Sequence, residues 1–166
     1  MTNEVLVIDD NSDIRLLISS ILKDKGFTVR EAANYEQALI EIKKKVPDVA
    51  VIDVKLDKGD NDGIELLTYL KKVDPDVPAI MISGHANVQM AVDSLKLGAF
   101  EFMQKPFSSE RLLNFVNRAL ENVDLKKEKK ILESKLFHSY DIIGESQKIL
   151  KVKDLITKLG NTESRV

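Results

Sequence analysis

The sequence contains no cysteine and no tryptophan, and only two of its 166 residues are histidines. The lack of cysteine excludes disulfides, thiolate metal ligands and a catalytic thiol. Two histidines, His85 and His138, are too few for a histidine-rich metal centre. The net charge of −2 gives no attraction to nucleic acid or to membrane surfaces. There is no bilayer-spanning apolar run and no signal peptide at the start, so we expect a cytoplasmic protein.

Short apolar runs alternate with helical patterns along the first 122 residues. Continuous apolar runs at 5–8 and 49–52 predict buried strands, and further strands are expected at 27–32, 77–82 and 100–103. Five strand–helix units in alternation predict an α/β fold with a doubly wound parallel sheet. With right-handed crossovers, a five-stranded sheet of this length is flavodoxin-like, with the strand order 2-1-3-4-5.

The helices between these strands carry recognisable start signals and apolar faces. We expect Ser12 to cap the first helix, and Asn34 to cap the second, with Gln37 completing a capping box. Phe107 and Leu112 have the spacing of a hydrophobic staple at the start of the fifth helix. The inward faces of the first, third and fourth helices are predicted to be Ile14, Leu17, Ile18, Ile21 and Leu22; Ile64, Leu67, Leu70 and Val73; and Val88, Ala91, Val92 and Leu95.

The fifth helix is predicted to be unusually long, because residues 108–137 contain neither proline nor glycine. Its charge-rich part, 123–139, carries a sparse line of Leu125, Leu132 and Leu136. Two interpretations fit this line, a short coiled-coil seam and a solvated linker helix. Residues 140–166 change character and look like the start of a second domain, with a turn at Gly144 and an amphipathic helix after it.

Polar side chains stand at the carboxyl ends of four predicted strands. Asp9 and Asp10 follow the first strand, Asp53 ends the third, Ser83 ends the fourth and Lys105 follows the fifth. In an open parallel sheet these ends share one edge, where ligands bind. Each residue alone fits a helix cap or a solvated turn, but the full set predicts one site.

The chemistry of this set favours phosphoryl transfer. Three close carboxylates repel one another, so they share protons or hold a cation. Hard oxygen ligands favour Mg²⁺, which keeps water ligands and accepts phosphate oxygens. A carboxylate can attack phosphorus, and an ammonium and a hydroxyl can stabilise the transferred group.

Five acids lie between positions 53 and 65, and we do not expect them to form one cluster. With Gly63 as the central glycine of a calcium loop, the first and last ligands would be Lys58 and Tyr69, which cannot serve. Asp62 is expected to cap the third helix and Glu65 to lie in its first turn. Asp57 and Asp60 are expected to be solvated, which leaves Asp53 as the working carboxylate.

The aspartate pair at 9–10, Asp53, Ser83 and the KPF at 105–107 together resemble the receiver domain of bacterial two-component response regulators, a CheY-like fold, over residues 4–122. The resemblance implies that Asp53 accepts a phosphoryl group from a phosphohistidine on a sensor histidine kinase. It also implies that Asp9 and Asp10 organise Mg²⁺. Asp10, Asp53 and the backbone carbonyl of Lys55 would be the direct protein ligands.

The same resemblance assigns the remaining site positions. Ser83 matches the switch hydroxyl, and Lys105 the lysine that contacts phosphate, with a cis peptide bond to Pro106. Phe102 matches the aromatic switch position, although a plain core role also fits it. His85 either touches incoming groups or is an exposed loop residue. The loop VKLDKGDND is about two residues longer than is usual in receivers and lacks their proline.

The segments after residue 97 resemble the NtrC family of sigma-54-dependent activators, and its NtrX-like members in particular. This implies a receiver at 1–122, a helical linker at 123–139 and the first part of an AAA+ ATPase domain at 140–166. The longer parent would bind ATP, DNA and sigma-54 RNA polymerase, whereas this chain has no P-loop motif. An NtrY-like sensor kinase is the implied partner. The implied homodimer uses the fourth helix, fifth strand, fifth helix and linker.

Three other functions are alternatives for a sequence of this kind. An aspartyl-phosphate hydrolase of related fold usually has a second acid two residues after the nucleophile, where this chain has Lys55. A flavin-binding protein would need a loop rich in Ser, Thr and Gly after the first strand, where this chain has the acidic stretch DDNSD. The third alternative is a receiver that acts as a dimerisation module without phosphate. We therefore expect a signalling switch and not an enzyme.

Overall fold

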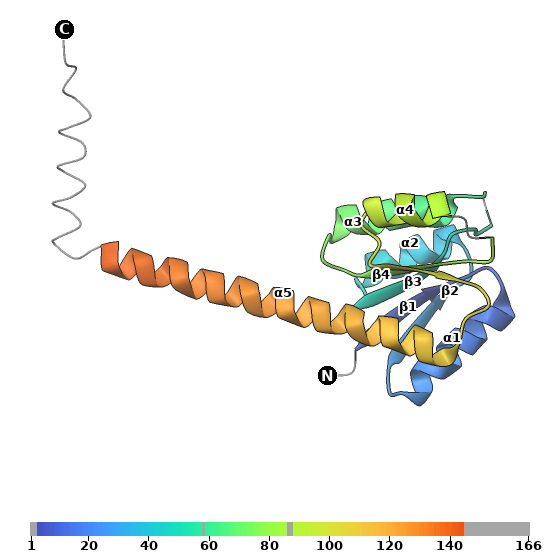
Figure 1. The fold of residues 1–166 in the computed structure, drawn as a ribbon, viewed down its shortest axis with the longest axis horizontal. Helices are drawn as coiled ribbons and strands as arrows, with labels where there is room; N and C mark the ends of the chain where they lie inside the picture. Colours follow the sequence, from blue (N-terminus) through green and yellow to red (C-terminus); the bar gives the residue numbers. More distant parts are fainter. Residues whose placement is uncertain (1–2, 58, 86–87, 145–166) are drawn as a thin grey trace, which may run out of the picture. The chain divides into compact units, whose positions relative to one another are not determined.

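The computed structural model describes residues 3–57, 59–85 and 88–144, with side chains as far as residue 136. Within these ranges, five strands and five helices alternate along the chain (Figure 1). The strands are β1 (Glu4–Ile8), β2 (Thr28–Ala32), β3 (Val49–Asp53), β4 (Ala79–Ser83) and β5 (Glu101–Gln104). The helices are α1 (Ser12–Asp24), α2 (Tyr35–Lys44), α3 (Asp62–Val73), α4 (Val88–Lys96) and α5 (Ser109–Gly144).

The strands form one parallel sheet in the order β2-β1-β3-β4-β5, which confirms the predicted fold class and strand order. The register pairs Ile8 with Ile52, Asp53 with Ile82, and Ser83 with Gln104. The carboxyl ends of β1, β3, β4 and β5 are therefore side by side. Parallel strands always bring corresponding ends to the same edge, which is how residues about 50 positions apart meet here.

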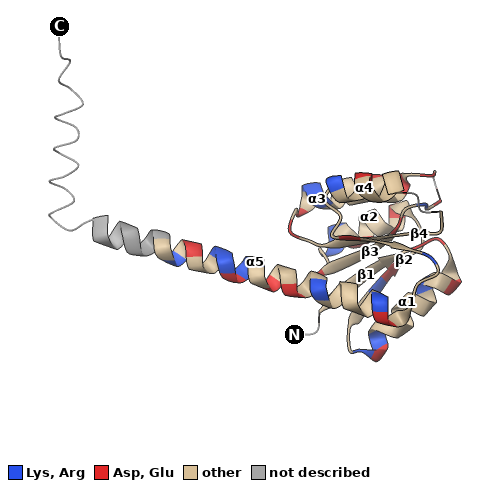
Figure 2. Cartoon of the chain, viewed as in Figure 1, with Lys and Arg blue, Asp and Glu red and all other residues tan. Residues whose placement is uncertain are grey.

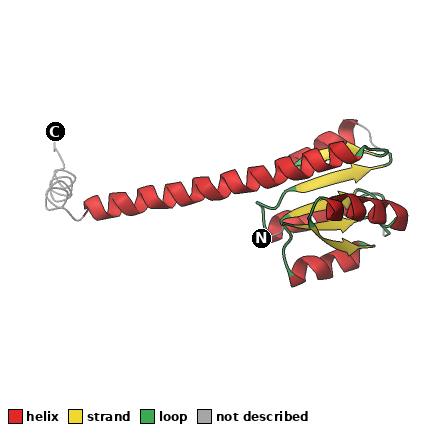
Figure 3. Ribbon diagram, turned by 90° about the horizontal axis from the view of Figure 1, so that it is seen from below, coloured by secondary structure: helices red, strands yellow, loops and turns green. Residues whose placement is uncertain are grey.

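Helices cover both faces of the sheet (Figures 1 and 3). On one face, α2 and α3 pack over Leu6, Ile8 and Ile52. On the other face, α1 and the first part of α5 pack over Val5, Val7 and Val51. Each of β1, β3 and β4 is buried along its whole length, as expected for strands covered on both sides.

Two details of helix α1 differ from prediction. Its N-cap is Asn11, not Ser12, and the Asn11 side chain accepts hydrogen bonds from the amides of Asp13 (2.9 Å) and Ile14 (3.3 Å). Ser12 is the first helical residue, where a hydroxyl no longer reaches those amides. Leu17 is 49% exposed because Ile18 and Leu22 form the centre of the buried stripe and Leu17 lies outside it.

The predicted starts of α2 and α5 are confirmed. The Asn34 side chain accepts from the amide of Gln37 at 2.9 Å, and Gln37 accepts from the amide of Ala33 at 2.9 Å. At the start of α5, Phe107 and Leu112 pack into the same core cluster, and the Ser108 hydroxyl accepts from the amide of Arg111 at 3.2 Å.

The predicted inward face of α4 is wrong. Val88, Val92 and Leu95 are 82%, 39% and 47% exposed, while Ser94 is fully buried. The Ser94 hydroxyl donates to the backbone oxygen of Met90 at 2.8 Å, which satisfies the buried polar group within the helix itself. Helix α4 therefore carries an apolar strip that nothing in the described part of the chain covers.

The predicted long C-terminal helix is present as α5. Its line of Leu125, Leu132 and Leu136 is exposed, at 64%, 61% and 58%, among charges of both signs (Figure 2). Both interpretations of this line, seam and solvated linker, therefore remain. The described part of the helix ends at Gly144, so the turn predicted there is not tested. The predicted amphipathic helix after Gly144 lies outside the described residues. No helix in the described ranges is long and apolar enough to cross a membrane.

Candidate functional site

The predicted site residues meet at the carboxyl edge of the sheet. Asp9 directly follows β1, Asp53 ends β3, Ser83 ends β4 and Lys105 directly follows β5. Backbone hydrogen bonds fix these ends to one another, since the Lys105 amide donates to the oxygen of Ser83 at 2.8 Å and the Val54 amide to the oxygen of Ile82 at 2.8 Å. The side chains are thus positioned by the ends of the strands.

Lys105 bridges two of the carboxylates. Its ammonium lies 2.6 Å from Oδ2 of Asp53 and 2.7 Å from Oδ2 of Asp9. The Lys105 side chain is 16% exposed, and those of Asp53 and Asp9 are 8% and 2% exposed. Partners this well shielded from water attract one another much more strongly than a surface pair does. The remaining Asp9 oxygen, Oδ1, accepts from the amide of Asn11 at 2.9 Å.

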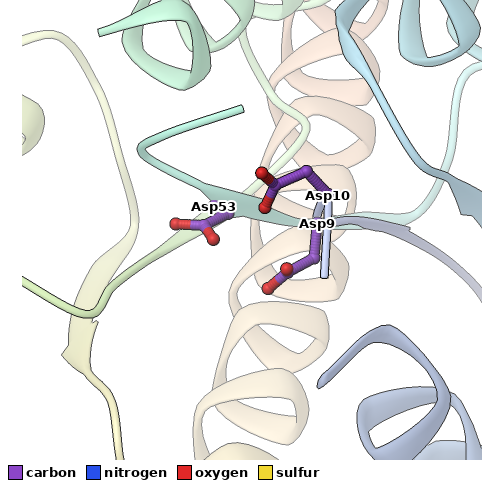
Figure 4. A group of neighbouring side chains, drawn as sticks. All are labelled: Asp9, Asp10 and Asp53. Carbon is purple, nitrogen blue, oxygen red and sulfur yellow. The ribbon is translucent and has the colours of Figure 1, made fainter. Parts of the chain in front are cut away.

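Asp9, Asp10 and Asp53 form the predicted acidic cluster, with one oxygen from each lying within 4.8 Å of the others (Figure 4). Asp10 is exposed, whereas Asp9 and Asp53 are buried. Three carboxylates with a single ammonium leave excess negative charge, and hard oxygen donors suit Mg²⁺. The residues present therefore fit a divalent cation. Both oxygens of Asp9 and both oxygens of Asp53 accept hydrogen bonds, so these contacts do not distinguish the two as direct ligands.

The two buried charges at the centre of the site perturb each other. Burial raises the pKa of the Asp53 carboxyl, the Lys105 hydrogen bond opposes that rise, and the negative charge of Asp9 adds to it. Burial alone would lower the pKa of Lys105, but its hydrogen bonds to Asp53 and Asp9 outweigh burial and raise it. Lys105 is therefore a fixed positive charge, and Asp53 is a carboxylate less solvated than usual.

The site opens into a cavity of about 550 Å³. Ser83 lies at its wall with its side-chain oxygen accepting from the amide of His85 at 3.3 Å. His85 also lines the cavity and is exposed, so it is an exposed loop residue that lies beside the site. The full lining is Asp10, Asn11, Asp53, Val54, Lys55, Asp60, Ser83, Gly84, His85, Met90 and Lys105.

Two further predicted positions, Phe102 and Pro106, are close in sequence to Lys105, which lines the cavity. The peptide bond between Lys105 and Pro106 is cis. Phe102 is half-buried and packs against the core cluster beneath α2 and α3. It does not line the cavity.

The loop between β3 and α3 is where the prediction needed most correction. Asp62 does not cap α3; the N-cap residue is Asn61. The buried Asp62 carboxylate instead accepts from the amides of Leu56 (2.8 Å) and Gly59 (3.3 Å), and so holds the loop together. Asp57 is exposed as predicted, yet it accepts from the amide of Tyr35 at 3.1 Å.

Asp60 is also exposed as predicted but forms an ion pair with Lys55 at 2.7 Å. The hydrogen bond between them raises the pKa of Lys55 and lowers that of Asp60. The amide of Lys55 lies 3.3 Å from Oδ1 of Asp53, its acceptor. Of the five acids between 53 and 65, only Asp53 joins the carboxylate cluster.

Sequence reasoning missed Arg15 and Gly63. Arg15 donates from Nη1 to the backbone oxygen of Asp9 at 2.7 Å and so holds the start of the acidic loop. Gly63 brings the first turn of α3 against the end of β3, and its amide donates to the oxygen of Val54 at 3.0 Å. An Asp-Gly pair at a helix start was visible in the sequence, but the close approach it permits was not.

Comparison with known proteins places this geometry in context. Residues 5–117 match the model of the response regulator receiver domain family. The nitrogen assimilation regulatory protein NtrX of Azorhizobium caulinodans is 37% identical over 166 residues, covering 100% of this chain and 36% of that protein. The chain thus spans about a third of the length of the curated relatives it matches.

Two solved structures extend the comparison. NtrX from Brucella abortus in complex with ADP is 36% identical, with a TM-score of 0.76, over 99% of this chain and 37% of that one. The beryllofluoride-activated NtrC4 receiver domain dimer is 38% identical, with a TM-score of 0.68, over 72% of this chain and 98% of that one. With its sheet order, its site and these matches, the chain belongs to the response regulator receiver domain family, and its relatives include NtrX proteins.

Proposed function

We propose that this chain is a phosphorylation-controlled switch in which Asp53 accepts a phosphoryl group from a sensor histidine kinase of the NtrY kind. The observation that carries the proposal is the environment of Asp53. It is a buried carboxylate at the end of a central strand, 2.6 Å from the Lys105 ammonium and within 4.8 Å of Asp9 and Asp10. The alternative roles for Asp53 are a solvated turn residue and a helix cap. Neither role explains why an ammonium bridges two buried carboxylates.

The transfer needs few groups. The Asp53 carboxylate attacks phosphorus, the bond from phosphorus to the histidine nitrogen breaks, and the electron pair returns to that nitrogen. Lys105 holds charge on the transferred phosphoryl oxygens, and the Ser83 hydroxyl donates to one of them. A bound Mg²⁺, held by Asp10, Asp53 and the carbonyl of Lys55, would supply further neutralisation of phosphoryl charge.

Phosphorylation of Asp53 would change the packing of neighbouring residues, and this would carry the signal away from the site. A phosphoryl oxygen that draws in Ser83 would move the end of β4, and Phe102 on the neighbouring strand would repack. This shifts the population between two arrangements of the face made by α4, β5 and α5. That face carries the exposed Val88, Val92, Leu95 and Leu97, and a second copy of the chain would cover it. The activated NtrC4 receiver is a dimer, which supports this output.

The rest of the function belongs to a longer parent. By similarity to NtrX and NtrC proteins, that parent would be a cytoplasmic sigma-54-dependent activator with an AAA+ ATPase domain beginning near residue 140. Phosphorylation would then control its oligomerisation through the receiver and linker. The chain is accordingly proposed as a signalling module and not as an enzyme.

The test is to incubate the protein with Mg²⁺ and acetyl phosphate and to look for a base-labile phosphorylated species by mass spectrometry. Wild type should gain one phosphoryl group and Asp53→Asn none. Asp57→Asn is the matched control, since it changes an exposed acid four residues away whose role as an acceptor asparagine can keep. Equal labelling of wild type and Asp53→Asn would refute the proposal.

Size measurements then separate the switch from a phosphate-independent dimerisation module. Light scattering of wild type with and without beryllofluoride should show a shift toward dimer, which Asp53→Asn abolishes. A dimer of the same strength in all samples would favour the phosphate-independent module instead.

A further inference from the structure

The rim of the site cavity carries an ion pair whose two side chains have no role in the steps described above. The Lys55 ammonium lies 2.7 Å from Oδ1 of Asp60, and their side chains are 67% and 83% exposed. Both residues line the cavity that contains Asp53 and Lys105. The Lys55 ammonium beside Asp53 is thus paired with the Asp60 carboxylate, and both side chains are largely exposed to water.

The backbone that carries this pair is firmly held. The Val54 amide donates to β4, Leu56 is 3% exposed, and the Asp62 carboxylate accepts from the amides of Leu56 and Gly59. Lys55 lies between two anchored residues, and Asp60 follows a third. The side chains of Lys55 and Asp60 can therefore exchange partners by rotation about their own bonds, with no movement of the loop.

The charge inventory of the site leaves room for one more cation after phosphorylation. Asp9, Asp10 and Asp53 contribute three negative charges and Lys105 one positive charge, so a divalent cation brings the unphosphorylated site to neutrality. A phosphoryl group turns the single charge of Asp53 into nearly two and adds three acceptor oxygens. One negative charge is then uncompensated, beside a lysine whose present partner is a fully solvated carboxylate.

We infer that Lys55 exchanges partners when Asp53 is phosphorylated, moving its ammonium from Asp60 to the phosphoryl group. This inference rests on the proposed function of Asp53. Lys55 then adds to the binding of the phosphoryl group, and Asp60 is a positioning residue that competes for Lys55 and lowers the affinity of the site for phosphoryl. An exposed ion pair is weak, so a doubly charged group in a partly desolvated cavity displaces it.

The test is a double-mutant cycle of Lys55 and Asp60. The dissociation constant of beryllofluoride is measured for each variant by calorimetric titration at saturating Mg²⁺. Lys55→Met should weaken binding roughly tenfold, as expected for loss of one charge-assisted hydrogen bond, while Lys55→Arg should largely restore it. Asp60→Asn should tighten binding roughly threefold, because Lys55 then has no ion pair to break before it contacts beryllofluoride. In the Lys55→Met background, Asp60→Asn should change binding by less than about twofold.

The inference is overturned if Asp60→Asn tightens binding by the same factor in both backgrounds, since Asp60 would then act only through its own charge. It is also overturned if Lys55→Met binds as wild type does. Lys129→Met is the matched control for loss of one exposed positive charge, and it should bind as wild type does. Failure of wild type itself to bind beryllofluoride would be a failure of the proposed function and not of the exchange.

Discussion

A β-carbon on Gly63 would collide with the backbone oxygen of Asp53 and lie 2.8 Å from the α-carbon of Val54. The neighbours on this side are backbone atoms at the end of a buried strand, which cannot rotate away. We therefore expect Gly63→Ala to lower the free energy of unfolding by about 1–3 kcal/mol, the usual range for overpacking. The same shift should displace Asp53 and slow its labelling by acetyl phosphate.

Gly59 provides the control for this prediction. It lies in the same loop, and a β-carbon added to it would meet nothing within 4 Å. Gly59→Ala should leave both urea unfolding and labelling close to wild type. If Gly63→Ala matched Gly59→Ala in both measurements, the contact between α3 and β3 would not restrain the site as described.

The strands and the working residues could be predicted because each depends on local signals. Continuous apolar runs such as 49–52 require burial on both faces, and this fixes a parallel sheet and hence a shared carboxyl edge. Asp9, Asp53, Ser83 and Lys105 were found by their positions at strand ends. Their convergence needs only the topology, not any detail of packing.

The errors occurred where two local signals compete or where partners are distant. Asn11 and Ser12 are adjacent residues that cap helices equally well, and one residue of offset decides which side chain reaches the free amides. Asp62 looks like a cap, but the path of the loop puts the amides of Leu56 and Gly59 around its carboxylate. Helix α4 shows that a helical apolar pattern does not say whether its face meets the core or a partner.

Arg30 is a second feature that sequence patterns do not reveal, because its partners lie far along the chain. Its guanidinium donates to Glu4 at 2.7 Å and to the backbone oxygens of Glu41 (2.7 Å) and Lys45 (2.6 Å) at the end of α2. Arg30→Met keeps the aliphatic stem but removes these three hydrogen bonds, those to Glu4 and Glu41 being partly buried. We expect unfolding free energy to fall by about 1–3 kcal/mol.

Lys23→Met is the comparison for Arg30→Met. Lys23 is 55% exposed and pairs with Glu31 at 3.5 Å. An exposed pair of this kind contributes under about 1 kcal/mol, so urea unfolding should change little. If the two variants lost the same unfolding free energy, the acceptors of Arg30 would be hydrated in its absence, and the Arg30 hydrogen bonds would contribute no more than an exposed ion pair does.

The contacts of Glu4 with Arg30 and Lys45 predict how stability depends on pH. Burial alone would raise the pKa of Glu4, but hydrogen bonds from Lys45 and Arg30 outweigh it and lower that pKa below its usual 4.5. A carboxyl with a lowered pKa in the folded state contributes stability above its unfolded pKa, and that contribution is lost as pH falls through the folded value. Urea unfolding from pH 7 down to pH 3 should therefore show stability falling below about pH 4.5. Glu4→Gln should flatten this fall; an identical pH profile in the variant would contradict the assignment.

Mg²⁺ should reverse the effect of removing the Asp10 charge. Without the cation, Asp10 lies in a cluster of three carboxylates that repel one another, so Asp10→Asn with chelator present should be at least as stable as wild type. With Mg²⁺ at roughly 100 times its dissociation constant, wild type should gain about 2.7 kcal/mol of unfolding free energy. Asp10→Asn should lose most of that gain because it lacks a direct ligand. Asp24→Asn, which changes an exposed acid at the end of α1, should follow wild type under both conditions. If Asp10→Asn instead gained as much from Mg²⁺ as wild type, the cation would not lie between Asp10 and Asp53.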